Sequence, residues 1–445
     1  MSLPRRLEPA GLQQETRGAG HALFVLGLAA GLLAALAVDR ATRFFLDRDI
    51  ELVRSVRDLA LADFVREVPA QKLIDDALAG MLAGLDDHSR YFGPPEIADL
   101  DRETSGEFLG IGVVFREGEL GRILFPYPGS PAEKAGLRVG DRIVGAEGQP
   151  VEALDARALR ALLHREDAEI RLDVESLEGD RREVRLRPGV VLDPTVPHVR
   201  MLEPERGIGY ACIRSFSHRT MDEFDQAVAS LQQRGLRALV LDLRFNPGGI
   251  LDAAISIANR FVAAGALVAT RTRTETRVTE ADPKRATLAG LPLVVLLDQD
   301  SASASEVLAA ALQDHAVAVL VGEPSYGKGT VQTLKRIGRA RAVVKLTTAN
   351  YCSPSLRRIE HEDGDAEHNG IAPDLWVPLT RAERGELLAF LRGYSPPESA
   401  LQALRAWEQR GGLDLIDEPP MDRQLVAALA LLAGGNLKAH GLPLR

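Results

Sequence analysis

Hydrophobic and polar positions alternate in different ways along the chain, and the changes of pattern divide it into segments. Residues 22–38 form an uncharged apolar run, which as a helix would span roughly 26 Å, at the short end for crossing a membrane. Residues 44–86 repeat apolar positions at helical spacing. Residues 106–190 alternate short β patterns with turn signals and include one helical stretch. From about 207 to 378, β and helical runs alternate, and this predicts a mixed α/β domain.

The apolar run near the N-terminus predicts export. Basic residues precede it, namely Arg5, Arg6 and Arg17, and positive charge favours the cytoplasmic side. A buried core helix is a poorer interpretation, because such a helix normally carries a polar face. The segment Ala35-Leu36-Ala37 also resembles a small-x-small cleavage site, so a cleaved signal competes with a retained anchor. We therefore expect a cytoplasmic segment 1–20, an anchor or signal 21–38, and an exported remainder.

Composition narrows the choice of chemistry. The hydrophobic content of 45% and charged content of 26% are ordinary for a globular protein, and the net charge of -9 argues against broad nucleic-acid binding. Cys212 and Cys352 lack metal-ligand spacing and could either pair or stay as buried thiols. Only seven of the 54 Lys+Arg are lysines. A lysine in a special context is therefore notable, because a desolvated lysine can lose its proton and an arginine cannot.

One group of motifs is typical of a peptide-binding module. The stretch FLGIGVV, from Phe108 to Val114, is followed by GSPAEKAGL and then by VGDRIV. Together they resemble a PDZ domain, whose Gly-x-Gly loop can bind a chain-terminal carboxylate and whose next strand can accept an added peptide strand. We assign peptide binding to Gly110, Ile111, Gly112 and Val113. A small β domain with ordinary turn glycines is the plainer alternative.

Three further segments carry candidate catalytic residues. The first, ALVLDLRFNPGG at 238–249, is a buried-type strand that runs into a glycine turn. The second, VVLLDQDSASASE at 294–306, predicts a strand, a serine-rich turn and a helix. Ser303-x-x-Glu306 also fits a helix capping box, although three alternate serines exceed what a cap requires.

The third segment, VGEPSYGKGTVQ at 321–332, places Lys328 between two glycines. It fits the start of a phosphate-binding P-loop, G-x-x-x-x-G-K. The residue after Lys328 is Gly329, however, where that motif needs a magnesium-binding hydroxyl, and Glu323-Pro324 would add a negative charge and remove an N–H donor from a phosphate cradle. We regard nucleotide binding as the weaker interpretation.

In this order the segments resemble the C-terminal processing (tail-specific) peptidases, serine–lysine enzymes of bacterial envelopes and plastids. The resemblance covers about residues 44–380 and includes DDHSRYF at 86–92, where that family commonly has Asp-Pro-His, and GIAPD at 370–374. It implies that Ser303 is the nucleophile, that Lys328 is the base and that Gln332 belongs to the same site. It also implies a bacterial cell-envelope location, with an inner-membrane anchor and a periplasmic catalytic domain, or secretion into the periplasm after cleavage.

The expected mechanism follows from these residue types. A lysine can act as base toward a serine hydroxyl if burial lowers the lysine pKa toward neutrality. Gln332 would orient the neutral amine, and the backbone N–H groups of Ala304 and Gly249 are our candidates for the oxyanion hole. No metal or cofactor is expected. A Ser–His–Asp arrangement, for example with His218, and a metal site among His361 to His368 are the weaker catalytic alternatives.

The predicted protein is a mixed α/β serine endopeptidase core at 191–395. A PDZ-like β domain at 103–190 precedes it or is inserted into it, and helical regions at 39–102 and 396–445 flank the two. Its partners would be proteins with exposed C-terminal tails, the membrane, an activator or adaptor, and further copies of itself. An inactive PDZ scaffold that recruits another peptidase is the main alternative.

Two further expectations concern regulation and assembly. Arg165 follows the predicted helix 154–164, at a position where the family commonly has an arginine, and could sense a bound tail. A solvated surface arginine is the plainer interpretation. The apolar helix near Leu425–Ala433 could form an oligomer interface or close the core.

Overall fold

The computed structural model describes residues 49–116, 118–165, 168–338, 342–360, 370–392, 396–411 and 419–434. The chain divides into two compact units, Met1–Leu85 and Asp86–Arg445. Within the described residues, no helix combines the length and the apolar character needed to cross a membrane. The anchor or signal expected at 21–38 lies outside the described residues.

The first unit is helical where it is described. Residues 49–63 form one helix and α2 (Ala70–Ala83) a second. Helical spacing of apolar residues predicted this. Side chains such as Val56, Leu59 and Met81 are exposed, and no residue of α2 is buried.

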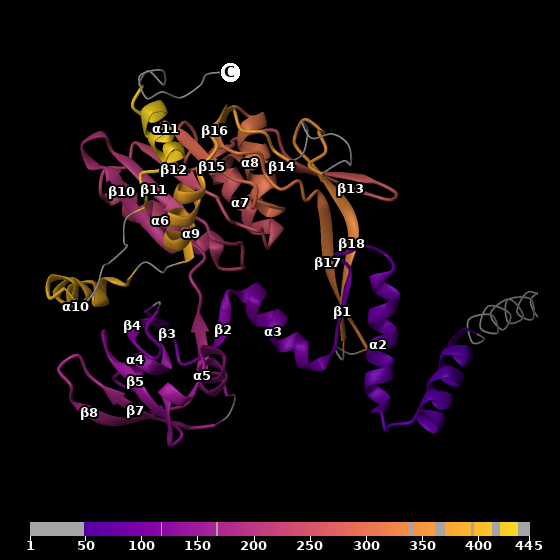
Figure 1. Ribbon diagram of the computed structural model, residues 1–445. Coiled ribbons are helices and arrows are strands. Elements are labelled where there is room, and N and C mark those ends of the chain that lie inside the picture. The colour runs from indigo at the N-terminus through magenta and orange to yellow at the C-terminus, as the bar shows by residue number, and fades with distance from the viewer. Residues whose placement is uncertain are drawn as a thin grey trace, which may run out of the picture. The chain divides into compact units, whose positions relative to one another are not determined.

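A six-stranded sheet forms the centre of the second unit (Figure 1). Its order is β10 (His198–Glu203), β11 (Ile208–Cys212), β12 (Ala238–Asp242), β15 (Leu293–Leu297), β16 (Val319–Gly322) and β19 (Leu375–Trp376). Only the β10–β11 pair is antiparallel, and the other pairs are parallel. Strands and helices alternate along the chain in this region, so the predicted mixed α/β core is confirmed.

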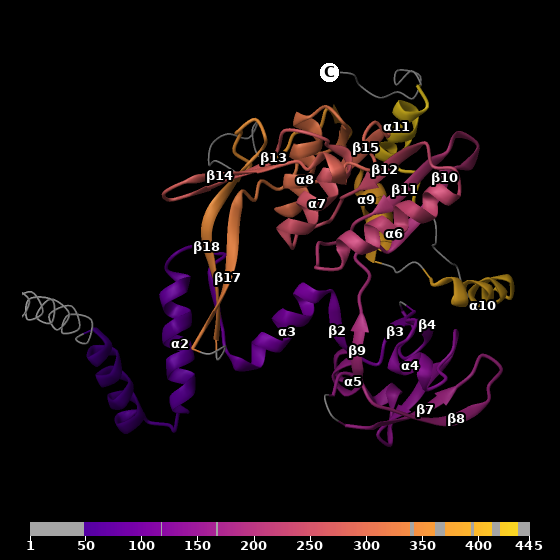
Figure 2. The ribbon, with the colours of Figure 1, turned by 180° about the vertical axis from the view of Figure 1, so that it is seen from behind.

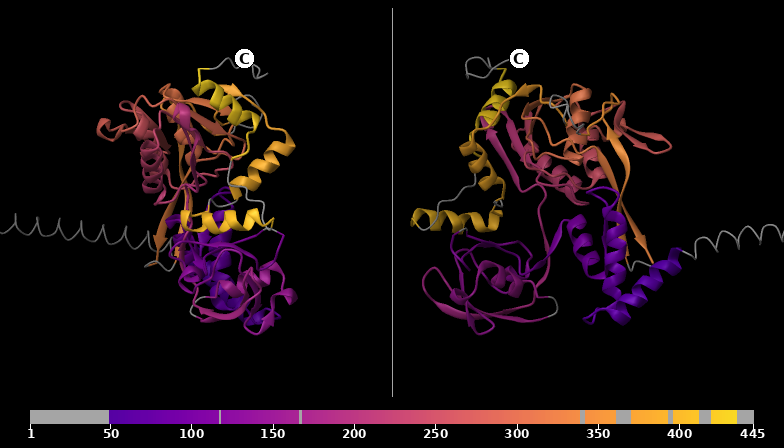
Figure 3. Two further views of the ribbon diagram at one scale, coloured as in Figure 1. Left: turned by 90° about the vertical axis from the view of Figure 1, so that its left-hand side faces the viewer. Right: turned by 45° about the vertical axis from the view of Figure 1, so that its right-hand side comes forward.

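Helices cover both faces of this sheet (Figures 1 and 2). On one face, strand residues such as Leu239 and Leu241 pack with α6 (Thr220–Gln233), α7 (Leu251–Phe261) and α8 (Ala304–Asp314). On the other, Val240 and its neighbours pack with α9 (Arg381–Arg392) and α11 (Arg423–Leu432), the gold and yellow helices in the upper half of Figure 3. Alternate strand residues therefore serve two cores, because successive side chains point to opposite faces.

The position of α11 resolves one expectation about the C-terminal region. Leu425, Ala427 and Ala428 are fully buried against the central sheet. The apolar helix near Leu425–Ala433 therefore closes the core.

A second sheet extends from the core. It contains β1 (Arg90–Phe92), β18 (Ala342–Cys352), β13 (Ala266–Thr272) and β14 (Thr276–Glu280), and β17 (Thr330–Ile337) pairs with β18. The sequence pattern did not predict β1, which lies within the region 39–102 that we expected to be helical. β1 pairs with β18, so the protease sheet begins before the PDZ-like domain and that domain is inserted into the core. The helical region is thus interrupted by a strand of the core, and resumes with α3 (Pro94–Ser105).

The inserted domain is a small β structure with two short helices. It comprises β2 (Glu107–Gly110) paired with β9 (Gly189–Leu192), β3 (Val113–Phe115) paired with β4 (Ile123–Pro126), a sheet of β6 (Gln149–Pro150), β5 (Arg142–Ala146), β7 (Ile170–Glu175) and β8 (Arg181–Leu186), and the helices α4 (Pro131–Lys134) and α5 (Ala156–Leu163). Its apolar core includes Ile111, Ile123 and Leu159. α10 (Glu398–Gln409) packs Leu404 and Trp407 against Phe125 of this domain.

Candidate active site

The three motif segments follow three neighbouring strands of the central sheet. β12, β15 and β16 are parallel and adjacent, so their carboxyl ends meet at one edge. Loops at that edge are the usual place for a site in an open α/β sheet. We call the loops after them the glycine loop (243–250), the serine loop (298–303) and the lysine loop (323–329).

The three alternate serines at the end of the serine loop and the start of α8, Ser301, Ser303 and Ser305, have different surroundings. Ser301 Oγ donates a hydrogen bond to the carbonyl of Leu243 at 2.9 Å, and Ser305 Oγ donates to that of Asn246 at 3.0 Å. These two serines therefore join the serine segment to the glycine loop. Ser303, between them, has φ +55° directly before α8, a conformation that non-glycine residues rarely adopt. Such strained residues concentrate at functional sites.

Glu306 links the serine loop to the lysine loop. Its carboxylate is fully buried and accepts backbone N–H bonds from Ser303 at 2.7 Å, Gly327 at 2.6 Å and Lys328 at 2.9 Å. The hydroxyl of Ser325 donates a fourth bond at 2.6 Å. Burial raises the pKa of Glu306, while these hydrogen bonds oppose that rise. The sequence indicated Glu306 only as a capping residue and missed this link.

The same bonds weigh against the P-loop interpretation. A P-loop binds phosphate oxygens through its backbone N–H groups. Here the N–H groups of Gly327 and Lys328 already donate to Glu306. A buried carboxylate thus occupies the place that a phosphate would need.

The glycine loop lies directly against Ser303. The backbone carbonyl of Asn246 accepts a hydrogen bond from the N–H of Ala302 at 2.9 Å. The side-chain oxygen of Asn246 accepts one from the N–H of Gly248 at 2.9 Å. Gly249 has φ +139°, and a side-chain carbon there would lie 2.0 Å from the carbonyl oxygen of Phe216. Only glycine fits this position.

Backbone donors remain available beside Ser303. Among the described residues, the structure records no acceptor for the N–H of Gly249 or of Ala304. By contrast, the N–H groups of Gly248 and Ser303 are hydrogen-bonded.

One cavity of about 1210 Å³ brings the predicted residues together. Ser303, Gly249, Lys328 and Gln332 all line it. Among the described residues, no hydrogen bond joins the side chains of Ser303, Lys328 and Gln332 to one another. The amide nitrogen of Gln332 donates to Thr330 Oγ1 at 2.8 Å, which leaves its oxygen as an acceptor.

Lys328 has an unusual electrostatic environment. Burial lowers its pKa, the nearby Lys345 lowers it further, and Glu306 acts in the opposite sense. Lys345 lies on β18 and lines the same cavity. Lys345 belongs to none of the sequence motifs, and the rarity of lysine in this chain was the one signal that pointed to it.

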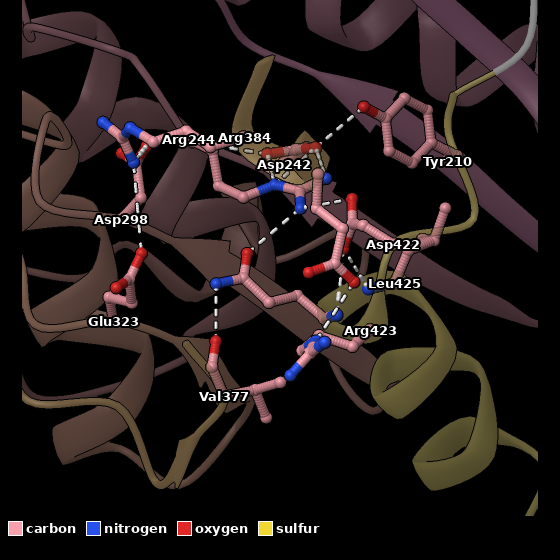
Figure 4. A network of polar contacts seen from close by, with 12 residues as sticks. Tyr210, Asp242, Arg244, Asp298, Glu323, Val377, Arg384, Asp422, Arg423 and Leu425 are labelled. Atoms are coloured by element: carbon pink, nitrogen blue, oxygen red, sulfur yellow. Dashed lines mark hydrogen bonds and ion pairs between the residues drawn. The ribbon is translucent and has the colours of Figure 1, made fainter. Parts of the chain in front are cut away.

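A buried ion network supports the glycine loop from behind (Figure 4). Arg244 is ion-paired with Asp242 at 2.6 Å and with Asp422 at 2.8 Å, and all three side chains are almost wholly buried. The hydroxyl of Tyr210 donates to Asp242 at 2.8 Å. Because Asp422 caps the N-terminus of α11, the network fixes this helix to the base of the loop.

The predicted peptide-binding residues lie in the inserted domain. Gly112 has φ +77°, and a side-chain carbon there would lie 2.4 Å from Ser130 Cβ, so glycine is needed. Ile111 is buried in the domain core, and Val113 begins β3. In the described part of the chain β3 pairs only with β4, so its other edge is open. Arg165 is exposed just after α5.

The structure also bears on the weaker alternatives, namely a histidine triad, a metal site and a pair of cysteines. His88 and His164 line the cavity, whereas His218 is not among its lining residues. In the part of the chain that the structure describes, no hydrogen bond joins His88 or His164 to Ser303. The proposed metal ligands His361 and His368 lie outside the described residues. Within the described part of the chain, no group of three or more His, Cys, Asp or Glu side chains is placed to hold a metal ion. Cys212 and Cys352 are buried free thiols.

Comparison with known proteins identifies the family. Residues 207–377 match the profile of peptidase family S41, and residues 123–176 match that of the PDZ domain. A carboxy-terminal-processing protease of Bartonella bacilliformis is 35% identical over 325 residues, which cover 71% of this chain and 72% of that one. The chain belongs to peptidase family S41.

Other relatives carry similar names. A carboxyl-terminal-processing protease of Picosynechococcus sp. is 35% identical, over 68% of this chain and 72% of that one. The solved photosystem II D1 C-terminal processing protease is 30% identical, covers 73% of this chain and 86% of that one, and has a TM-score of 0.42. The two profiles and the 35% identical relative show that this S41 chain is a serine-type peptidase with a PDZ domain, and the resemblance seen in the sequence is confirmed.

Proposed function

We propose that this peptidase cuts the C-terminal tails of exported proteins by an acyl-enzyme mechanism, with Ser303 as nucleophile and Lys328 as base. The observation that carries the proposal is the pair of hydrogen bonds from the N–H groups of Ser303 and Lys328 to one buried carboxylate, Glu306. They hold the two loops together at one cavity. The lowered pKa of Lys328 favours the neutral amine that a base requires.

The reaction would proceed as follows. Neutral Lys328 takes the proton of Ser303 as Oγ attacks the scissile carbonyl carbon, and the oxygen of Gln332 orients the amine. The N–H groups of Ala304 and Gly249 donate to the oxyanion, a contribution of about 3–4 kcal/mol per donor in other enzymes. Protonated Lys328 then gives its proton to the leaving amine. Water, activated by Lys328, hydrolyses the acyl group on Ser303.

The PDZ domain would select the substrate. The loop Gly110–Val113 leads into the open edge of β3, which is suited to adding the extended tail of a substrate as a further strand. Backbone bonds of this kind would give affinity, and the Gly-x-Gly loop would bind the chain-terminal carboxylate of the tail. Arg165 would report the bound tail to the catalytic core, and an activator or adaptor protein could add to this control.

Mixing the purified protein with a tailed peptide and identifying the products by mass spectrometry tests the proposal. We expect cuts near the C-terminus by the wild type, and binding without cleavage by Ser303→Ala. Undiminished cleavage by purified Ser303→Ala would contradict the assignment of the nucleophile. Binding without cleavage by the wild type, with every peptide tried, would favour the PDZ scaffold.

The exported location is a separate part of the proposal. It rests on the apolar run 22–38 and on the arginines before it. A reporter that works only outside the cytoplasm, fused after residue 100, should be active. Activity of a cytoplasmic reporter at the same junction would show that the topology is wrong. Whether the anchor is retained would follow from the mass of the mature protein.

A further inference from the structure

Arg384 of α9 contacts all three loops of the active site, and Figure 4 shows its contacts with Asp298 and Glu323. Its guanidinium lies 3.2 Å from Asp298 and 2.5 Å from Asp300, both in the serine loop. It lies 3.9 Å from Glu323 in the lysine loop. Its central carbon is 4.4 Å from the centre of the Phe245 ring in the glycine loop. One side chain thus touches each segment that carries a part of the proposed machinery.

Arg384 contacts a residue with a strained backbone, Phe245, and the carboxylate that is hydrogen-bonded to it, Asp298. Phe245 has φ +58°, a costly conformation for an aromatic residue. Its N–H donates to the Asp298 carboxylate at 2.9 Å, and the backbone N–H of Asp298 donates to Ser301 Oγ at 3.0 Å. Asp298 is therefore the junction between the glycine and serine loops, and Arg384 binds this junction.

Arg384 also balances a concentration of negative charge. Burial raises the pKa of Asp298, whereas the Phe245 N–H and Arg384 lower it. Burial likewise raises the pKa of Glu323, with Arg384 lowering and Asp298 raising it. Without the guanidinium, carboxylates on the serine and lysine loops would repel each other across a partly buried space.

The rest of α9 lies behind the same loops. Leu388 and Leu391, one and two turns beyond Arg384, line a second cavity of about 690 Å³ together with Ala302 and Lys328. The helix face that carries Arg384 therefore forms a wall beside both the nucleophile segment and the lysine. A shift of α9 would therefore move both the nucleophile segment and the segment that carries Lys328.

We propose that Arg384 is a positioning residue that holds the glycine, serine and lysine loops in register for catalysis. This inference rests on the proposed function of those loops. Arginine suits the task because its planar fork can bind two carboxylates while its face stacks on an aromatic ring, which lysine cannot do. Arg384 acts through the loops and does not itself touch the substrate.

The test compares Arg384→Gln with Arg423→Gln. Arg423 begins the neighbouring helix α11 and pairs with Glu383 on the protein surface, so its loss removes a similar charge without touching the loops. We expect Arg384→Gln to lower kcat by about 100-fold, the cost of a small misplacement of reacting groups. KM for a short peptide and tail binding should stay near wild type, and Arg423→Gln should stay near wild type in every respect.

Two further variants cover the case in which Arg384→Gln fails to fold. Arg384→Lys keeps the charge but loses the fork and the stacking, and should recover only part of kcat. Asp300→Asn removes one contact at a half-exposed position and should lower kcat by about tenfold, or about 1.4 kcal/mol.

The inference would be overturned if the folded Arg384 variants had the same kcat as Arg423→Gln, or if Asp300→Asn and Arg384→Lys both kept wild-type kcat. A rise of KM in Arg384→Gln as large as the fall of kcat would also overturn it. Ser303→Ala keeps the two proposals apart. If it retains activity the proposed nucleophile is wrong, whereas an inactive Ser303→Ala beside a fully active Arg384→Gln contradicts only the role of Arg384.

Discussion

The buried carboxylate of Glu306 accepts the backbone N–H of Lys328 at 2.9 Å. The same oxygen accepts the N–H of Ser303, while the other oxygen accepts Ser325 Oγ and the N–H of Gly327. Glu306 thus fixes the backbone of the proposed base relative to that of the proposed nucleophile. A single residue in the first turn of α8 sets the geometry of two loops.

Replacing Glu306 by Gln should therefore disrupt catalysis. An amide has only one acceptor oxygen, so its NH2 group would face either the N–H groups of Ser303 and Lys328 or the N–H of Gly327 beside the hydroxyl of Ser325. Each unsatisfied buried donor costs about 1–3 kcal/mol. We expect kcat to fall by at least about 100-fold, with a lower melting temperature and little change in tail binding.

The control for this prediction is Glu383→Gln. Glu383 also lies in the first turn of a helix and accepts from the backbone N–H of Thr380, but it lies outside the cavity that holds Ser303. Near-normal kcat for this variant beside a strong loss in Glu306→Gln would support the account. Equal kcat in the two variants would show that the link between the loops is dispensable.

A second prediction concerns the pH dependence of kcat/KM. Activity needs neutral Lys328, so kcat/KM should rise with pH through the pKa of that residue and then level off. Burial and the positive charge of Lys345 lower this pKa. Replacing Lys345 by Met removes one of these causes, so the rising part of the pH profile should move to higher pH. At a fixed pH on that part of the profile, kcat/KM should fall tenfold for each pH unit by which the profile moves.

Two variants serve as controls for the Lys345 prediction. Lys345→Arg keeps the charge, so the rising part of its kcat/KM profile should lie at nearly the same pH as in the wild type. Lys335→Met removes a lysine from the exposed part of β17, outside the cavity, and should not shift that part of the profile. A profile that stays unchanged in Lys345→Met would contradict the electrostatic role of Lys345.

The same pKa shift affects stability with a definite sign. Folding lowers the pKa of Lys328, so between the folded and unfolded values the unfolded state holds more protons. The contribution of this group to the free energy of unfolding therefore increases as pH rises through that window. Lys328→Met should flatten this part of the stability profile.

A third prediction concerns Arg165, which is exposed after α5. If it reports a bound tail to the core, Arg165→Ala should lower cleavage of tailed peptides by at least about tenfold while tail binding stays nearly unchanged. Arg157→Ala, which removes an exposed charge from α5 itself, is the control. Wild-type cleavage by Arg165→Ala would show surface charge only, and equal losses of binding and cleavage would place Arg165 in the groove.

Much of the site was predictable because its motifs are local. The buried strands β12, β15 and β16 read as apolar runs, and each is followed by residues typical of turns, such as glycine, serine and proline. Parallel neighbours then bring those ends together. Ser303, Lys328, Gln332 and Gly249 therefore line one cavity, and their catalytic roles stay a prediction.

The features that the sequence did not predict depend on contacts between segments far apart in the chain. β1 has only three residues, and its pairing with β18, some 250 residues later, leaves no local pattern. Glu306 looked like an ordinary capping residue, since its bonds to Gly327 and Lys328 form only in the folded chain. Arg384 is one of many arginines on a helix, and nothing in its neighbours indicates Phe245 or Asp298.

The central claim is that Lys328 supplies a neutral amine to Ser303, and the activity of Lys328→Arg tests it most directly. The variant keeps the positive charge and most of the side-chain volume, but a guanidinium stays protonated in proteins and cannot act as the base. The measurement is kcat/KM on one tailed peptide for the wild type, Lys328→Arg and Lys328→Ala, with folding checked by thermal melting. We predict that Lys328→Arg is as inactive as Lys328→Ala, whereas substantial turnover by Lys328→Arg would contradict the serine–lysine mechanism.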